Sequence, residues 1–91
     1  MSVQIEFLGP LRRLVGGTES IQIEPVILAE ALIELDRRYA GLNQRLLQED
    51  GSLHSYINIY VNEEDIRFGD QLRTKLSSGD TVTVISAIAG G

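Results

Sequence analysis

Three stretches of the chain alternate apolar and polar residues, at positions 3–7, 20–24 and 55–62. Successive side chains of a β-strand point to opposite faces, so an alternation with period two predicts a strand with one buried face. The stretch 81–85 (Thr-Val-Thr-Val-Ile) is rich in β-branched residues and predicts a further strand. The pattern therefore makes a sheet the main element of the fold.

One helix is predicted, over residues 26–40. Its apolar residues recur at the three- and four-residue spacing of a single helix face, namely Leu28, Ala31, Leu32, Leu35 and Tyr39. Pro25 suits the first helical position, with Glu24 as a cap beside the positive end of the helix dipole. Gly41 suits the C′ position that follows a helix. We interpret the apolar stripe as core and not as a cofactor site.

Glycine, proline and polar clusters indicate where these elements are separated. Gly16-Gly17 marks a turn between the first two strands, which we expect to pair as an antiparallel hairpin. Residues 11–15 fit a helical turn and a strand continuation equally well. A short turn of helix is expected at 42–47. The turn at 62–64 is expected to lead into a short strand over 65–68.

The order strand, strand, helix, strand, short strand, strand predicts an α+β fold. We expect a mixed sheet of four to five strands with one main helix packed on one face, because one helix covers only one face of a sheet. Tyr60 and Ile85 should lie on the open face. Exposed aromatic and aliphatic side chains there would form a docking face for a partner. Scattered surface apolar residues are the alternative interpretation.

Length and composition narrow the class of protein. The 91 residues suit one domain, expected over 1–86, followed by a tail over 87–91. The chain has no cysteine, which removes disulfides and thiolate chemistry, and a lone His54 does not make a metal site. A net charge of −5 argues against nucleic-acid binding and favours a basic protein partner. There is neither a signal peptide nor an apolar run of about 20 residues, so we expect a cytoplasmic protein without membrane contact.

The tail has a chemistry of its own. Small and apolar residues that could enter a partner's active site precede the last glycine, namely Ala87, Ile88, Ala89 and Gly90. Five extended residues reach about 16 Å, and glycine lets another backbone approach closely. The carboxylate of Gly91 is an anion at pH 7 and becomes an acyl donor only after activation, for example by ATP. Because many chains end in small residues, Gly-Gly alone also allows an inert tail.

Three segments together resemble the MoaD/ThiS family of sulfur carriers, which have the ubiquitin-like β-grasp fold. They are 60–68 (YVNEEDIRF), 76–82 (LSSGDTV) and 87–91 (AIAGG), and the resemblance covers essentially the whole chain. Residues 53–68 are especially similar to the subgroup that supplies sulfur for cysteine synthesis. Many family members carry a proline just before the Ala-Gly-Gly region, where this chain has Ser86-Ala87. That departure weakens assignment to the molybdopterin subgroup.

The resemblance implies a carrier that is a protein substrate and not an enzyme, with no bound cofactor. An adenylating enzyme of the ubiquitin-activating type would bind the open face, thread the tail and use ATP to form an acyl-adenylate on Gly91. A sulfur donor would then leave a thiocarboxylate. Its sulfur would pass to a synthase, either a cysteine synthase or the large subunit of molybdopterin synthase. The alternatives are a protein modifier conjugated to lysines and an interaction module with an inert tail.

Overall fold

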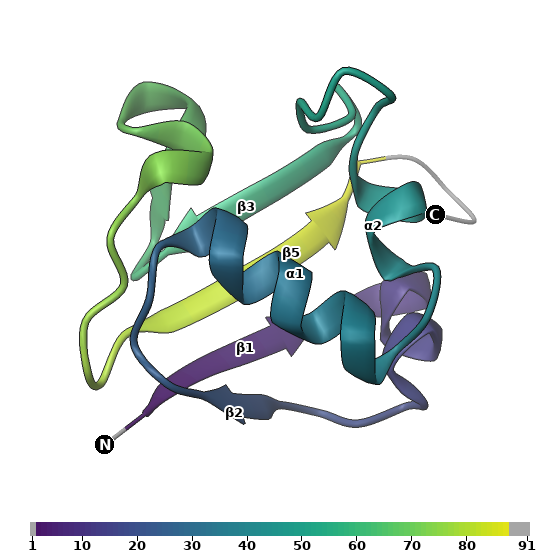
Figure 1. Cartoon of the computed structure of the whole chain (residues 1–91), viewed down its shortest axis with the longest axis horizontal. Helices are drawn as coiled ribbons and strands as arrows, with labels where there is room; N and C mark the ends of the chain where they lie inside the picture. The colour runs from purple at the N-terminus through teal and green to yellow at the C-terminus, as the bar shows by residue number, and fades with distance from the viewer. Residues whose placement is uncertain (1, 88–91) are drawn as a thin grey trace.

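The computed structural model describes residues 2–87, and Figure 1 shows the path of the chain. The strands are β1 (Val3–Phe7), β2 (Ile21–Ile23), β3 (Ile57–Val61), β4 (Glu64–Asp65) and β5 (Thr81–Ser86). The α-helices are α1 (Leu28–Arg38) and α2 (Leu42–Leu46). Three short 3₁₀ helices join them, η1 (Gly9–Val15), η2 (Ile66–Phe68) and η3 (Gln71–Arg73).

The five strands form one mixed sheet in the order β2-β1-β5-β3-β4. The last strand, β5, lies in the centre, parallel to β1 and antiparallel to β3. The predicted α+β class and mixed sheet are confirmed, and so is the antiparallel pairing of the first two strands. Their connection contains η1, so residues 11–15, which the sequence pattern left open, belong to a 3₁₀ helix.

The core lies between α1 and the face of the sheet that this helix crosses (Figure 1). Every second residue of the central strands points into it, as the alternation predicts, and is shielded from solvent. All buried residues of the described chain are hydrophobic. The best-shielded ones on the sheet and helix include Val3, Ile5, Ile57, Ile59, Val82, Val84, Leu28, Ala31, Leu32 and Leu35.

The ends of the helix differ from the prediction. Helix α1 begins at Leu28 with Ile27 as its N-cap, so Pro25 is not the first helical residue and Glu24 is not a cap. The cause is tertiary pairing: Leu28 N–H donates to the Thr74 carbonyl (2.9 Å), and Ile27 forms a bridge with Lys75. An extended backbone at this bridge delays the helix, because local propensity yields to tertiary contacts.

The C-terminal end of α1 also departs from the expected C′ glycine. Tyr39 is the C-cap, and Gly41, two residues further on, has a φ of 89° and acts as the N-cap of α2. The left-handed backbone at Gly41 therefore serves the turn between two helices. The expected short helix at 42–47 is confirmed as α2.

The short strand expected over 65–68 is the other correction. Only Glu64 and Asp65 pair with β3, and residues 66–68 turn into η2. The Asp65 carboxylate accepts a hydrogen bond from the Arg67 N–H at 2.9 Å. An aspartate in this position caps the start of a helix, which favours the turn over a continued strand.

Candidate docking face and tail root

The tail leaves the sheet from its central strand. Ser86 is the last residue of β5 and is opposite Ile57, and the Ala87 N–H still donates to the Tyr56 carbonyl at 2.7 Å. Tyr56 in turn stacks on His54, with ring centroids 4.9 Å apart. The root of the tail is therefore tied to the start of β3. Ile88, Ala89, Gly90 and Gly91, for which the sequence predicts entry into a partner's site, lie outside the described residues.

The face of the sheet turned away from α1 carries both residues predicted for docking. Because Ile59 and Val84 point into the core, the alternation places Tyr60 and Ile85 on the opposite face, where both are half-buried. Tyr60 is opposite Thr83 and Ile85 is opposite Asn58, so the two lie on a diagonal across β3 and β5. Diagonal neighbours lie about 7–8 Å apart, within reach of one partner side chain.

Strand register adds residues to this face that the sequence analysis did not select. Glu6, Thr83, Tyr60 and Asp65 form one row across β1, β5, β3 and β4. Leu8 is half-buried, and its N–H donates to the Val84 carbonyl at 3.0 Å, which places it beside Ile85. The alternation of side-chain direction extends one residue beyond 3–7 and places Leu8 outward with Gln4 and Glu6, a signal that was available in the sequence although Leu8 itself is apolar. The row across four strands was not available there, because it depends on the register.

The open face is acidic. Glu6 and Asp65 stand at the two ends of the cross-strand row, and Glu63 borders a shallow depression that includes Thr81 and Thr83. None of the outward-facing residues of β1, β3, β4 and β5 is basic in the described chain, and the Arg67 guanidinium of η2 reaches the border of this face at Asn58. Part of the negative net charge of the chain is therefore located on this face, which suits a partner with a basic surface.

The turn between β3 and β4 is held in place at the end of this face where β5 begins. Asn62 and Glu63 both have positive φ, 50° and 78°, as a two-residue hairpin turn requires. The Asn62 amide donates to Asp80 Oδ1 at 2.7 Å and accepts from the Thr81 N–H at 3.0 Å. These bonds join the hairpin to the start of β5. The expected turn is confirmed at Asn62 and Glu63, whereas Glu64, which was expected in it, already pairs with Val61 in β4.

Arg67 has a structural role that its place in a sequence motif does not reveal. Its guanidinium donates to the carbonyls of Ser55 (2.9 Å) and Ile57 (2.7 Å) and to the side chain of Asn58. β4 pairs only with Tyr60 and Val61, so the outer edge of β3 before them lacks a strand neighbour. The guanidinium satisfies that part of the edge.

Comparison with known proteins agrees with this geometry. The profile of the ThiS family matches residues 5–91. "Sulfur carrier protein CysO" of Mycobacterium tuberculosis is 38% identical over 93 residues, covering all of both chains. The chain is similar in structure to one chain of the Amycolatopsis orientalis BexX/CysO complex, with a TM-score of 0.87, 37% identity, and coverage of 98% of this chain and 99% of that one. "Small archaeal modifier protein 3" of Haloferax volcanii is 31% identical over 94 residues, again covering all of both chains.

A mixed five-stranded sheet crossed by one main helix, with a tail leaving the central strand, defines a ubiquitin-like β-grasp protein. Within that class, the chain belongs to the ThiS family. The family resemblance read from the sequence is thereby confirmed. No helix within residues 2–87 is long and apolar enough to cross a membrane.

Proposed function

We propose that the chain is a sulfur carrier whose Gly91 carboxylate is activated by an ATP-dependent adenylating enzyme and converted to a thiocarboxylate. Family membership and the full-length similarity to a protein named as a sulfur carrier support this role. The observation that carries it is the junction of tail and sheet. The tail leaves the central strand beside the open face, so one partner can bind this face and receive the tail.

The chemistry needs only the terminal carboxylate from this chain. A Gly91 carboxylate oxygen attacks the α-phosphorus of ATP and pyrophosphate leaves, which gives an acyl-adenylate. Sulfur from a donor, such as a persulfide, then attacks the acyl carbon and AMP leaves. Reduction of the donor's remaining S–S bond by a thiol releases the thiocarboxylate. The acid and base groups belong to the partner, and this chain acts as substrate.

The open face is the surface proposed for the ubiquitin-activating-type enzyme. Tyr60 and Ile85 supply half-buried apolar area, and Glu6, Glu63 and Asp65 supply negative charge around it. A partner with apolar side chains at the centre of its surface and arginine or lysine at the rim would match. Four residues follow Ala87, and a fully extended chain of that length spans about 13 Å. That length is sufficient to enter a cleft of the partner enzyme beside its docking surface.

The recipient of the sulfur is proposed from the relatives. The similarity to CysO favours a cysteine synthase as the sulfur-accepting partner, ahead of the large subunit of molybdopterin synthase. The similarity to "Small archaeal modifier protein 3" supports a second candidate function, the formation of an isopeptide bond between Gly91 and lysines of other proteins. That alternative predicts slower-migrating conjugates in host cells, which a carrier does not need.

The deciding experiment is alkylation of the protein isolated from its native host. The sequence has no cysteine, so a label from a thiol-selective reagent on the C-terminal fragment marks a thiocarboxylate. We expect one label on the fragment that contains Gly91, detected by mass spectrometry. Deletion of Gly91 should abolish the label and leave the melting temperature unchanged, because the last described contact of the chain is made by Ala87.

Either of two outcomes would count against the proposal. The first is an unlabelled C-terminus after incubation with the host's adenylating enzyme, ATP and a sulfur donor. The second is full sulfur transfer by the Gly91 deletion. Unlabelled protein together with conjugates on lysines would favour the modifier function.

A further inference from the structure

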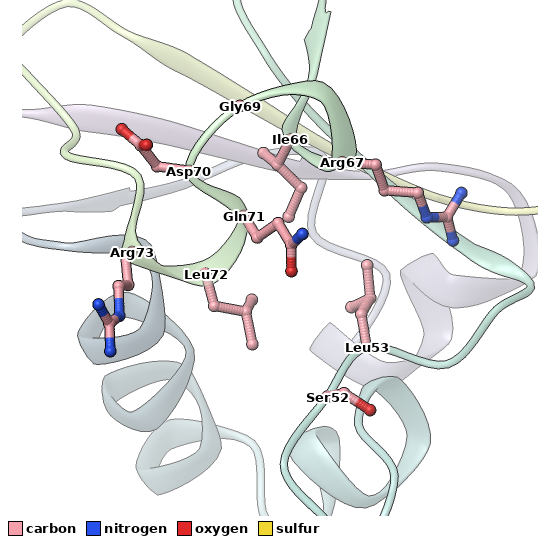
Figure 2. A pocket seen from close by; sticks show the side chains of 9 residues that line it. All are labelled: Ser52, Leu53, Ile66, Arg67, Gly69, Asp70, Gln71, Leu72 and Arg73. Atoms are coloured by element: carbon pink, nitrogen blue, oxygen red, sulfur yellow. The ribbon is translucent and has the colours of Figure 1, made fainter.

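A hollow of about 650 Å³ opens beside the connection between β4 and β5 (Figure 2). Leu53, Ile66 and Leu72 form its apolar part, and Arg67, Asp70 and Arg73 are among the residues at its rim. Figure 2 shows Arg67 and Arg73 on opposite sides of it, with Leu72 and Leu53 facing the space between. We call it the β4–β5 hollow.

The floor of the β4–β5 hollow is part of the folded core. Ile66 is 4% exposed, and Leu53 and Leu72 pack against the core cluster while remaining partly open. The loop that supplies Leu53 is held by Asp50, which accepts bonds from the Ser52 hydroxyl and N–H. These two hydrogen bonds hold the pKa of the Asp50 carboxyl below its ordinary value. The hollow is therefore preformed, as binding sites usually are.

The most exposed large apolar side chain of the described protein belongs to the turn beside this hollow. Phe68 is 92% exposed and lies between Arg67 and Gly69, which both line the hollow. The turn is rigidly tied. Its start is capped by Asp65, the Gly69 N–H donates to the Ile66 carbonyl at 3.1 Å, and the Arg67 side chain holds the edge of β3. The backbone that carries Phe68 is therefore held in place, so presenting this ring to a partner costs little backbone entropy, as is typical of an anchor.

The lining of the β4–β5 hollow has an excess of positive charge, whereas the adjoining β4 carries the carboxylates of Glu64 and Asp65. The chain carries a net charge of −5, but the rim has two arginines against Asp70. The Arg67 guanidinium donates its hydrogen bonds to acceptors within the fold. The exposed Arg73 guanidinium, in contrast, forms no ion pair among residues 2–87. A carboxylate from outside would find its charge complement at Arg73.

We propose that the β4–β5 hollow, together with Phe68, is a second docking surface, for a protein segment that presents an apolar side chain flanked by carboxylates. The apolar side chain occupies the space above Leu53, Ile66 and Leu72, and the Phe68 ring contacts the segment beside it. The carboxylates pair with Arg73 and with the positive field of Arg67. The occupant is thus an acidic, apolar-anchored segment of a partner protein.

This surface differs in position and in preferred charge from the open face. Its floor belongs to the core on the α1 side of the sheet, and residues 74–76 beside it pair with the start of α1. Tyr60 and Ile85 point to the other side. One protein can therefore hold the carrier at the hollow while another receives the tail. The proposal goes beyond sulfur transfer, and its test does not depend on Gly91.

The test uses the full chain labelled with ¹⁵N and a synthetic probe, acetyl-Glu-Glu-Leu-Phe-Glu-Glu-amide. We expect the peptide to shift the amide resonances of Leu53, Ile66 and Leu72, with binding that weakens as salt is added. A second peptide with lysine in place of each glutamate, and a third with Gly-Gly in place of Leu-Phe, should bind at least about tenfold more weakly.

Two variants separate the surface from the fold. Phe68→Ala and Arg73→Glu should each lower the affinity for the acidic peptide by about tenfold. Both should leave the melting temperature of the protein unchanged, because both side chains are exposed. Ile33→Ala, at a 52% exposed apolar residue of α1, is the matched control and should bind as the unaltered chain does. The proposal is overturned by resonances that do not shift at millimolar peptide, by shifts centred on Tyr60 and Ile85, or by equal binding of the lysine peptide.

Discussion

The two faces of the sheet use the same strands for different purposes. On the α1 side, the inward residues of β1, β3 and β5 are almost fully buried except at the strand ends Val61 and Ser86, and no polar side chain in the described chain is fully buried with them. On the other side, the same strands present half-buried residues with carboxylates at both ends of a row. One face accounts for stability and the other is left for recognition. Substitutions should therefore separate stability from function according to the face they affect.

The largest effect is expected on the helix-covered face. Ile59→Ala removes a fully buried side chain from the central strands, and such truncations cost about 2–5 kcal/mol. Urea denaturation followed by circular dichroism measures the loss. The control is Ile33→Ala on the exposed surface of α1, where we expect a change within about 0.5 kcal/mol. Equal losses for the two variants would contradict the assignment of the core.

An intermediate effect is expected at Arg67, which links the two sides. Its guanidinium binds Asn58 on the open face and also lines the β4–β5 hollow. Lysine cannot reproduce a planar donor fork that bonds two carbonyls, so Arg67→Lys should cost about 1–2 kcal/mol of unfolding free energy. The same change at Arg73, whose guanidinium forms no ion pair among residues 2–87, should cost less than about 0.5 kcal/mol. If both arginines tolerate lysine equally, the guanidinium does not stabilise the edge of β3.

On the open face the expected effect falls on binding. Ile85→Asp places a charge where the partner would bury an apolar side chain, and should weaken binding of the adenylating enzyme at least about tenfold, equal to about 1.4 kcal/mol. Tyr60→Asp should act in the same direction. Stability should change little because both side chains are only half-buried. Isothermal titration calorimetry measures the affinity, and unchanged affinity in both variants would remove the open face from the proposed interface.

The sequence predicted the faces of the strands better than it predicted the ends of elements. Alternation was sufficient to place Tyr60 and Ile85 away from the core, because side-chain direction in a strand follows from position alone. The preference of proline for the first helical position misplaced the start of α1 at Pro25, because the Ile27–Lys75 bridge that delays the helix joins segments far apart in the sequence. The cross-strand row and the clamp formed by Arg67 depend on register for the same reason.

A small gain in stability is expected at Glu63, opposite in sign to the effect on binding. Glu63 has a φ of 78° in the β3–β4 turn, a conformation that glycine adopts without strain. Glu63→Gly should therefore stabilise the fold by about 0.5–1 kcal/mol. The same change removes a carboxylate beside Thr83 on the open face, so binding of a basic partner should weaken, most clearly at low salt. Glu63→Asn removes the charge but keeps a residue that tolerates positive φ, and it should reproduce only the loss of binding. A gain in stability that leaves affinity and its salt dependence unchanged would show that the acidic edge of the face does not contact the partner.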